Sequence, residues 1–223
     1  MNVRLKANDG HECDAYVAAP GSKASKAVVI VQEIFGVNAH IRAVTDGYAR
    51  DGFLAIAPAL FDRVRRGVEL GYGPAAMQEG IGIMSKIGMD NALRDVAAAL
   101  EYAQEQVGPA HAGVVGFCVG GSLAWLAATR LQPAAAVGYY GGRIAQHAGE
   151  QPRCPVMLHF GKKDKHIPES EIDKIRGAHG DVPIFLYDAG HGFNCDQRAD
   201  YDAPSAELAR QRTLEFLNRQ LAG

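Results

Sequence analysis

The residues best suited to chemistry are a cysteine, an aspartate and a histidine in the second half of the chain. Cys118 stands between Gly116 and Gly120, and Asp164 and His191 follow it. A thiolate can attack a carbonyl carbon, a histidine can take the thiol proton, and a carboxylate can orient the histidine ring and stabilise its charge. Together the three side chains could form the triad of a nucleophilic enzyme.

The segment around Cys118 has the pattern of a strand, a sharp turn and a helix. Val114 and Val115 form a β-branched run, and an Ala/Leu-rich stretch of helical character begins directly after Gly120. A residue at the tip of such a turn has a strained backbone, and side chains two positions away would collide with it, so glycine fits there. The free N–H groups of the following helix favour a thiolate and an oxyanion. We therefore interpret Cys118 as a nucleophile rather than as one more buried cysteine.

The other two members of the triad each follow a predicted strand. Asp164 follows the strand expected at 154–160, and His191 lies between two glycines after the strand expected at 184–187. Ligands of parallel α/β sheets bind at the carboxyl ends of the strands. The order cysteine, aspartate, histidine is that of α/β-hydrolases, not of chymotrypsin-like or subtilisin-like proteases. We predict that the three side chains meet there; the competing histidine, His166, lies in the loop of Asp164 itself.

A fourth segment follows the apolar strand expected at 27–31. Glu33, Ile34 and Phe35 come directly after it, next to Gly36. In this architecture a loop at the end of a central strand supplies the second oxyanion donor, and we expect it to be the N–H group of Ile34. Glu33 is either a hydrated loop carboxylate or a partly desolvated group that tunes the charge state of the thiol, and the sequence leaves both interpretations open.

The remaining chain alternates strands with helices. We predict an edge hairpin at 3–7 and 13–18, strands at 53–57 and 134–140, and helices at 41–49, 90–106 and 204–221, with Asp90 as an N-cap. This alternation predicts a mostly parallel sheet with right-handed crossovers. The segment 62–74 could shape a substrate mouth, although its arginines at 63, 65 and 66 fit a solvated face. With 223 residues, no repeat and no linker, we expect a single α/β domain over residues 1–223.

Composition narrows the ligand and the compartment. A net charge of −2 gives no basic excess of the kind that follows nucleic acid or an anionic membrane, so we expect a small-molecule partner. The N-terminus lacks an apolar leader, and no stretch approaches the length of a membrane span. The four cysteines lie far apart and without zinc-ligand spacing. We expect free thiols, a cytoplasmic location, and a monomer or weak homodimer.

Four segments together resemble the dienelactone hydrolase (carboxymethylenebutenolidase) family. They are QEIFGVN at 32–38, GFCVGG at 116–121, VGYYG at 137–141 and GHGF at 190–193, and the resemblance covers nearly the whole chain. It implies an α/β-hydrolase fold with helices on both faces of a mostly parallel sheet. It also implies hydrolysis of a carboxylic ester or lactone, since enzymes of this family open the lactone ring of dienelactones.

The resemblance assigns roles to particular residues. It implies a catalytic triad of Cys118, His191 and Asp164. The backbone N–H groups of Ile34 and Val119 would form the oxyanion hole, and the carboxylate of Glu33 would modulate the thiol. It implies no metal and no organic cofactor.

The chain differs from the family pattern at the arginines that bind the carboxylate of the substrate. Dienelactone-specific members hold it with an arginine four residues after the triad histidine, where this chain has Cys195, and with a second arginine from the helical region before residue 90. The segment 74–90 has no arginine and offers Met77 and Ile81 instead. Arg198, Arg143 or the arginines at 63–66 could substitute. We expect the substrate contacts to include three residues: Phe35, Tyr72 and Arg143.

Two other classes of function fit parts of the pattern. A non-catalytic α/β module that binds a small ligand would leave Cys118 inert to iodoacetamide. A thiol redox sensor would form a reversible sulfenate or a disulfide, with Cys195 as a candidate partner, although no cysteine lies nearby in sequence to resolve it.

Overall fold

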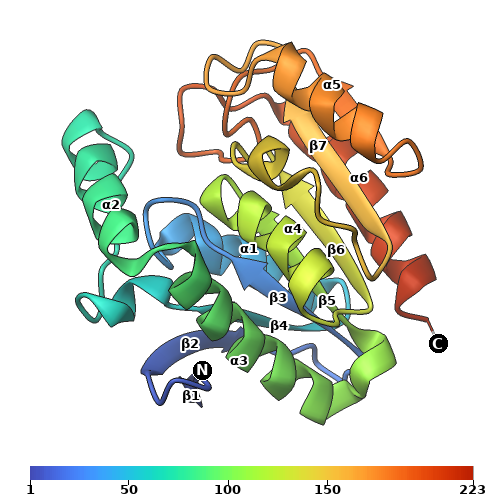
Figure 1. The fold of residues 1–223 in the computed structure, drawn as a ribbon. Coiled ribbons are helices and arrows are strands. Elements are labelled where there is room, and N and C mark those ends of the chain that lie inside the picture. The colour runs from blue at the N-terminus through green and yellow to red at the C-terminus, as the bar shows by residue number, and fades with distance from the viewer. Residues whose placement is uncertain (223) are drawn as a thin grey trace.

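The computed structural model describes residues 1–222 and contains an eight-stranded sheet in the order β1-β2-β4-β3-β5-β6-β7-β8 (Figure 1). The first two strands form an antiparallel edge hairpin, β2 also runs antiparallel to β4, and the other pairs are parallel. The strands are β1 (Asn2–Lys6), β2 (Glu12–Ala18), β3 (Lys26–Val31), β4 (Phe53–Pro58), β5 (Ala112–Phe117), β6 (Ala135–Tyr139), β7 (Val156–Gly161) and β8 (Ile184–Tyr187). The predicted mostly parallel sheet with an N-terminal edge hairpin is confirmed.

Helices cover both faces of the sheet. In Figure 1, α3 and α4 lie in front of the strands, and α1 and α6 lie behind them. The helices are α1 (Ala39–Arg50), α2 (Pro74–Ile87), α3 (Met89–Val107), α4 (Val119–Arg130), α5 (Glu169–Ala178) and α6 (Ala203–Gln220), with short 3₁₀ turns η1 (Leu60–Arg63), η2 (Pro109–His111) and η3 (Ile144–His147). The helices predicted at 41–49, 90–106 and 204–221 are α1, α3 and α6.

The start of α3 differs from the prediction. Gly88, with a φ of 73°, is both the C-cap of α2 and the N-cap of α3, so Asp90 is not the N-cap and lies in the first turn instead. Only glycine adopts this φ at little cost, and it lets one helix follow the other without a loop. The Asp90 carboxylate accepts a hydrogen bond from Arg130 of α4 at 3.0 Å.

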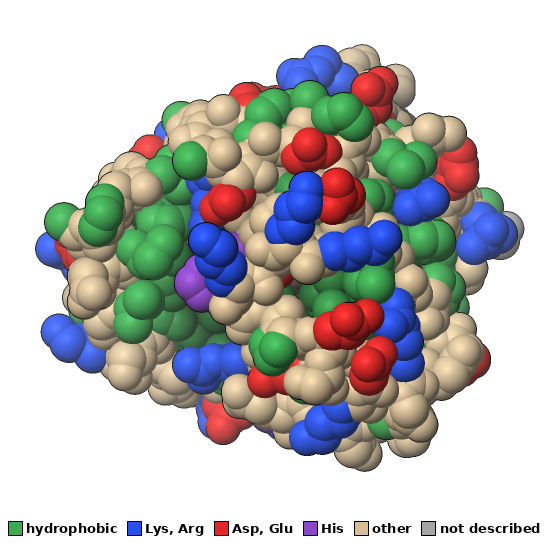
Figure 2. Space-filling model, turned by 90° about the horizontal axis from the view of Figure 1, so that it is seen from above, with side chains coloured by type: hydrophobic (Ala, Val, Ile, Leu, Met, Phe, Trp, Pro, Cys, Tyr) green, Lys and Arg blue, Asp and Glu red, His purple; other side chains and the backbone are tan. Residues whose placement is uncertain are grey.

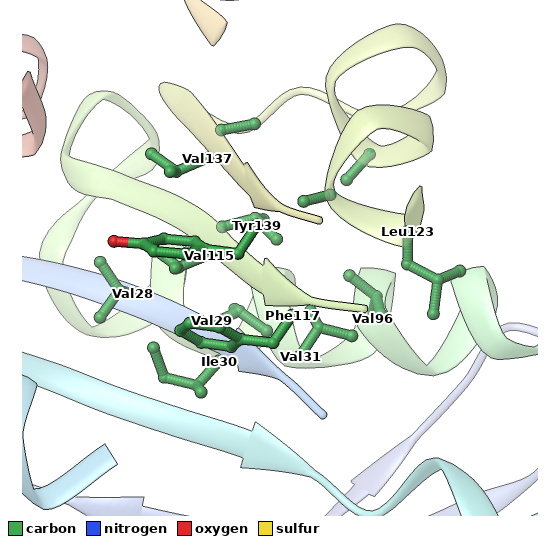
Figure 3. Packing of buried hydrophobic residues seen from close by; sticks show 14 of the residues in the cluster. Val28, Val29, Ile30, Val31, Val96, Val115, Phe117, Leu123, Val137 and Tyr139 are labelled. Atoms are coloured by element: carbon green, nitrogen blue, oxygen red, sulfur yellow. The ribbon is translucent and has the colours of Figure 1, made fainter. Parts of the chain in front are cut away.

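The central strands are buried on both faces, as expected of parallel strands between two helical layers. All six residues of β5 are buried, and so are five of the six in β3. Figure 3 shows the valine and isoleucine side chains of β3 packed beside Val115 and Phe117, with Val96 of α3 and Leu123 of α4 close by. This apolar core holds the strands in position relative to one another and so positions the loops that follow their carboxyl ends.

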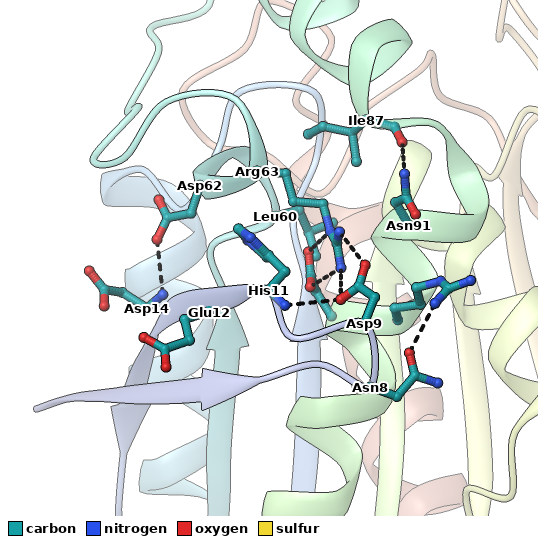
Figure 4. A network of polar contacts seen from close by, with 12 residues as sticks. Asn8, Asp9, His11, Glu12, Asp14, Leu60, Asp62, Arg63, Ile87 and Asn91 are labelled. Atoms are coloured by element: carbon teal, nitrogen blue, oxygen red, sulfur yellow. Dashed lines mark hydrogen bonds and ion pairs between the residues drawn. The ribbon is translucent and has the colours of Figure 1, made fainter.

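Besides the pairing of β2 with β4, Arg63 at the end of η1 links the hairpin to α3. Its guanidinium donates to both carboxylate oxygens of Asp95 in α3, at 2.7 and 2.8 Å, and to Asp9 in the hairpin turn, at 2.8 Å (Figure 4). The Arg63 side chain is 10% exposed and that of Asp95 is fully buried. The predicted solvated face is therefore wrong for Arg63, because its partners come from distant segments, whereas Arg65 is exposed as predicted.

None of the helices in residues 1–222 combines the length and the apolar character that crossing a membrane requires.

Candidate active site

Cys118 lies at the turn between β5 and α4 in a strained backbone conformation. Its φ is 56° and its ψ is −117°, a region that non-glycine residues rarely occupy. A Cβ built at Gly116 would lie 1.8 Å from the carbonyl oxygen of Gly120, and one at Gly120 would lie 2.3 Å from that of Val31. Both glycines are thus required by close backbone approach, and the sulfur stands at the N-terminus of α4.

The structure brings Cys118, Asp164 and His191 together. His191 Nε2 lies 3.2 Å from Cys118 Sγ, and His191 Nδ1 lies 2.7 Å from Asp164 Oδ2. The other oxygen of Asp164 accepts a hydrogen bond from the backbone N–H group of His166 at 2.8 Å, so both carboxylate oxygens are hydrogen-bonded. The side chain of Asp164 is fully buried and that of His191 is 10% exposed. The aspartate can therefore fix both the tilt and the tautomer of the imidazole ring.

The surroundings of His191 favour its charged form. Burial of the ring works against charge, but the hydrogen bonds to Asp164 and Cys118 outweigh burial and raise the pKa of His191 from 6.5 to about 10. The two hydrogen bonds therefore favour an imidazolium beside the sulfur at neutral pH. A cationic histidine is the partner that makes a cysteine nucleophilic in enzymes.

Glu33 follows β3 and is fully buried, which fits the desolvated alternative rather than the hydrated one. Its Oε1 atom accepts a hydrogen bond from Arg198 Nη1 at 3.3 Å, and the Arg198 side chain is only 9% exposed. Burial opposes the charge of Arg198, but attraction to Glu33 and to Cys118 outweighs it and raises the pKa of the guanidinium. Arg198 is therefore paired with the carboxylate and lines the same cleft as Cys118.

Gly192 makes room for this arginine. It has a φ of 80°, and a Cβ built on it would lie 2.5 Å from Arg198 Nη1. The glycine after His191 indicates in the sequence that another group packs closely against this position. The sequence does not say that this group is the Arg198 side chain.

A cleft of about 470 Å³ opens above these residues, and Figure 2 shows it as a hollow lined with hydrophobic side chains, with histidine and arginine or lysine side chains at its rim. One wall is apolar and includes three residues of α2; the other is polar and carries two arginines. The lining residues are Ile34, Phe35, Met77, Ile81, Met84, Ser85, Cys118, Val119, Ser122, Gly142, Arg143, Gln146, His166, His191 and Arg198. Such a cleft suits a small molecule with an apolar body.

The expected oxyanion donors and two of the three expected substrate contacts lie on this cleft. Ile34, Val119, Phe35 and Arg143 line it. Tyr72 is outside the lining: its ring packs on Phe35 with centroids 4.6 Å apart, and its hydroxyl accepts Asn38 Nδ2 at 3.0 Å. Tyr72 therefore lies behind Phe35 and supports the cleft wall.

The structure also shows which arginines lie where they could replace the two carboxylate-binding arginines of dienelactone-specific family members. Arg143 and Arg198 line the cleft, whereas Arg63 is committed to Asp9 and Asp95 below it. Sequence analysis names Met77 and Ile81 in the segment that forms α2, but not Met84 or the apolar wall that the three residues form. Met77, Ile81 and Met84 follow helical i, i+4, i+7 spacing, which was the available signal.

A mostly parallel sheet with a cysteine at a strained strand-to-helix turn and an Asp–His pair on the following loops defines an α/β-hydrolase. The family model described as the dienelactone hydrolase family matches residues 13–221. The chain belongs to this family, and it is a hydrolase of the carboxylic ester class.

Individual relatives match over nearly their full length. The carboxymethylenebutenolidase of Pseudomonas putida is 31% identical over 223 residues, covering 96% of this chain and 94% of the relative. Carboxymethylenebutenolidase 1 of Cupriavidus pinatubonensis is 29% identical over 222 residues, covering 96% and 95%. A crystal structure from Klebsiella pneumoniae, described as "Putative Dienelactone Hydrolase", superposes with a TM-score of 0.84 at 31% identity, covering 97% of this chain and 98% of that one.

Proposed function

We propose that the chain hydrolyses activated carboxylic esters or lactones with Cys118 as the nucleophile. The observation that carries the proposal is the continuous contact from Asp164 through His191 to the sulfur, at 2.7 and 3.2 Å, on the floor of a cleft. The strained backbone at Cys118 and its place at a helix N-terminus support the same role.

In the proposed reaction His191 holds the thiol proton and the thiolate attacks the substrate carbonyl carbon. The backbone N–H groups of Ile34 and Val119 stabilise the oxyanion; one such donor is typically worth about 3 kcal/mol, or on the order of a hundredfold in rate. His191 then protonates the leaving oxygen, the intermediate collapses to a thioester, and His191 activates the water that hydrolyses it. Asp164 keeps the ring oriented throughout.

Glu33 acts on the thiol through charge rather than by contact with substrate. Glu33 is a buried carboxylate paired with Arg198, and its negative charge partly cancels the positive charge of the arginine. It thereby changes how strongly Arg198 stabilises a thiolate at Cys118. Glu33 is in this proposal a modulator of the nucleophile, and Arg198 is the group through which it acts.

The substrate class follows from the chemistry of sulfur and from the cleft. A thiolate leaves a tetrahedral intermediate more easily than an alkoxide or an amine, so the substrate needs a good leaving group. Enol lactones, aryl esters and thioesters meet this condition, and peptides do not. The apolar wall formed by Phe35 and α2 accepts the body of such a substrate, while Arg143 and Arg198 offer positive charge to an anionic one. Dienelactones belong to this class.

The decisive experiment replaces the sulfur. Cys118→Ala should lower kcat/KM for p-nitrophenyl acetate and for a dienelactone by about 10³-fold or more, and the parent chain should trap an acyl group on Cys118 that mass spectrometry detects. Cys154→Ala, which changes another partly buried cysteine outside the cleft, serves as the matched control. Full activity in Cys118→Ala would rule out the nucleophile.

The proposal also includes the setting in which the enzyme works. We infer a single domain over residues 1–223 that acts in the cytoplasm on a small molecule, not on nucleic acid or a membrane, as a monomer or weak homodimer. All four cysteines of the described chain, residues 1–222, are free, and the net charge of −2 offers no basic surface excess. Sedimentation velocity over a range of concentrations tests the oligomeric state.

A further inference from the structure

Three side chains of metal-ligand type form a buried group that the proposed reaction does not use as a unit. Glu33 follows β3, His40 lies in the first turn of α1, and Cys195 lies in the loop between β8 and α6. A carboxylate oxygen, a ring nitrogen and the sulfur of these residues all lie within 4.8 Å of one another. We call them the Glu33–His40–Cys195 cluster.

Two polar atoms of this cluster lack partners. Among residues 1–222, Glu33 Oε2 and His40 Nε2 are buried and have no hydrogen bond, although the two residues are only 0% and 4% exposed. A buried polar atom without a partner typically costs about 1–3 kcal/mol. Two such atoms in one small cluster indicate that something absent from the chain itself satisfies them.

The ring of His40 is held in the way that metal-binding histidines are held. Its Nδ1 atom lies 3.1 Å from Asp196 Oδ1, which leaves Nε2 as the free nitrogen. Ligating histidines commonly donate their second ring nitrogen to a carboxylate, which fixes both tautomer and orientation. Asp196 is 65% exposed, and it lines with His40 a second cleft of about 440 Å³ beside α1 and α6. The carboxylate that orients His40 therefore lies on a different cleft from the one that holds Cys118 and His191.

We propose that Glu33, His40 and Cys195 bind one thiophilic divalent cation of the Zn²⁺ type. The carboxylate and the thiolate balance the charge of such an ion, and a donor set of one sulfur, one nitrogen and one oxygen selects Zn²⁺ or Co²⁺ over Mg²⁺ or Ca²⁺. Tetrahedral zinc places its ligand atoms about 3.3–3.8 Å apart, and the three atoms lie within 4.8 Å of one another, so the side chains need to close by at most about 1–1.5 Å. Three protein ligands leave a fourth position for water.

Arg198 is compatible with this ion. Its guanidinium bonds Glu33 Oε1 at 3.3 Å and leaves Oε2, the unpartnered oxygen, for the cation. The site goes beyond the proposed hydrolysis and shares only Glu33 with it, so that occupancy by a cation changes the charge that Glu33 presents to Arg198 and the sulfur.

The test is a Co²⁺ titration of the full chain carrying Cys118→Ser, followed by absorption spectroscopy. This background removes the sulfur of the triad, which with His191 could bind Co²⁺ by itself. We expect a sulfur-to-cobalt charge-transfer band that saturates at one equivalent, disappears when Zn²⁺ is added and persists in excess Mg²⁺. Adding Cys195→Ser should abolish the band, whereas adding Cys154→Ser as the matched control should leave it unchanged.

A second variant tests the site without altering a buried group. Asp196→Asn, at an exposed position, removes only the carboxylate that orients His40, and it should weaken Co²⁺ affinity by about 10- to 100-fold. The proposal is overturned if the Cys118→Ser chain gives no charge-transfer band, if the band survives Cys195→Ser, or if Asp196→Asn binds Co²⁺ as tightly as its parent. None of these results bears on whether Cys118 is the nucleophile.

Discussion

The backbone of Gly80 in α2 lies directly against the carbonyl group of Ile34: a Cβ built at Gly80 would be 1.9 Å from that oxygen. The helix that supplies the apolar wall therefore rests on the same residue whose N–H group we propose as an oxyanion donor. A change in how α2 is seated must move Ile34, because no side chain lies between them to absorb it.

Gly80→Ala should accordingly lower kcat by about 10- to 100-fold, since the added methyl group displaces Ile34 and misaligns one oxyanion donor. Gly82→Ala is the matched control in the same helix, because a Cβ built there meets no atom within 4 Å apart from its own chain neighbours and the nearby backbone of the helix. It should leave kcat unchanged and raise the free energy of unfolding by about 0.5–1 kcal/mol. Steady-state hydrolysis of p-nitrophenyl acetate and urea unfolding measure both effects. Equal kcat values in the two variants would show that the contact between Gly80 and Ile34 does not affect the oxyanion site.

Asp164→Asn should lower kcat/KM by about 10³- to 10⁴-fold, because the amide can no longer hold His191 in the tautomer that the reaction needs. His166→Gln is the control from the same loop. Its bond to Asp164 is made by the backbone N–H group and survives the substitution, so it should reduce activity far less. A loss in His166→Gln as large as in Asp164→Asn would point to another acid–histidine pair.

The pH dependence of His191 follows from the sign of its shift. The pKa is raised from 6.5 to about 10, so the ring stays protonated across neutral pH and loses its proton only at strongly alkaline pH. In Asp164→Asn the bond that favours charge is lost while burial, which opposes charge, remains, so the pKa must fall. NMR titration of His191 should show a midpoint well above 7 in the parent and a lower one in the variant. The alkaline limb of kcat/KM should move in the same direction.

Arg63 offers a test of the fold away from the cleft. Arg63→Met leaves the fully buried carboxylate of Asp95 without its cation and should cost about 3–5 kcal/mol of unfolding free energy. Arg65→Met, which removes an exposed pair with Glu79, should change it by less than about 1 kcal/mol. Urea unfolding decides between them, and the double variant Arg63→Met/Asp95→Asn should recover part of the loss. If both arginine variants unfold alike, the buried pair of Arg63 and Asp95 does not stabilise the fold.

The contrast between Arg63 and Cys118 shows what the sequence could predict. The elbow, the central strands and the order of the triad depend on local patterns: paired glycines, β-branched runs and loops at strand ends. Parallel topology then brings Asp164 and His191 to the same edge as Cys118, so the meeting of these three side chains could be predicted from the sequence.

The pairs that were missed join residues far apart in sequence. Glu33 and Arg198 are 165 positions apart, and Arg63 and Asp95 are 32 apart. No periodicity links such partners, and every arginine of a charged run looks solvated until the fold brings a carboxylate to it. The position of Tyr72 behind Phe35 was missed for a related reason, since loop membership does not say which side chain faces the cleft.

The cleft wall formed by α2 leads to the last prediction, on substrate choice. Met77 and Ile81 line the cleft where dienelactone-specific relatives are expected to carry an arginine, and Ile81 is 52% exposed. Ile81→Arg should therefore be tolerated by the fold and should raise kcat/KM for an anionic dienelactone relative to a neutral aryl ester by about 10- to 100-fold, the value of one charged hydrogen bond of about 1.5–3 kcal/mol. Ile81→Gln, which introduces a polar but uncharged side chain, is the control. A ratio that does not change with Ile81→Arg would mean that Arg143 and Arg198 already satisfy the substrate carboxylate, or that α2 lies too far from it.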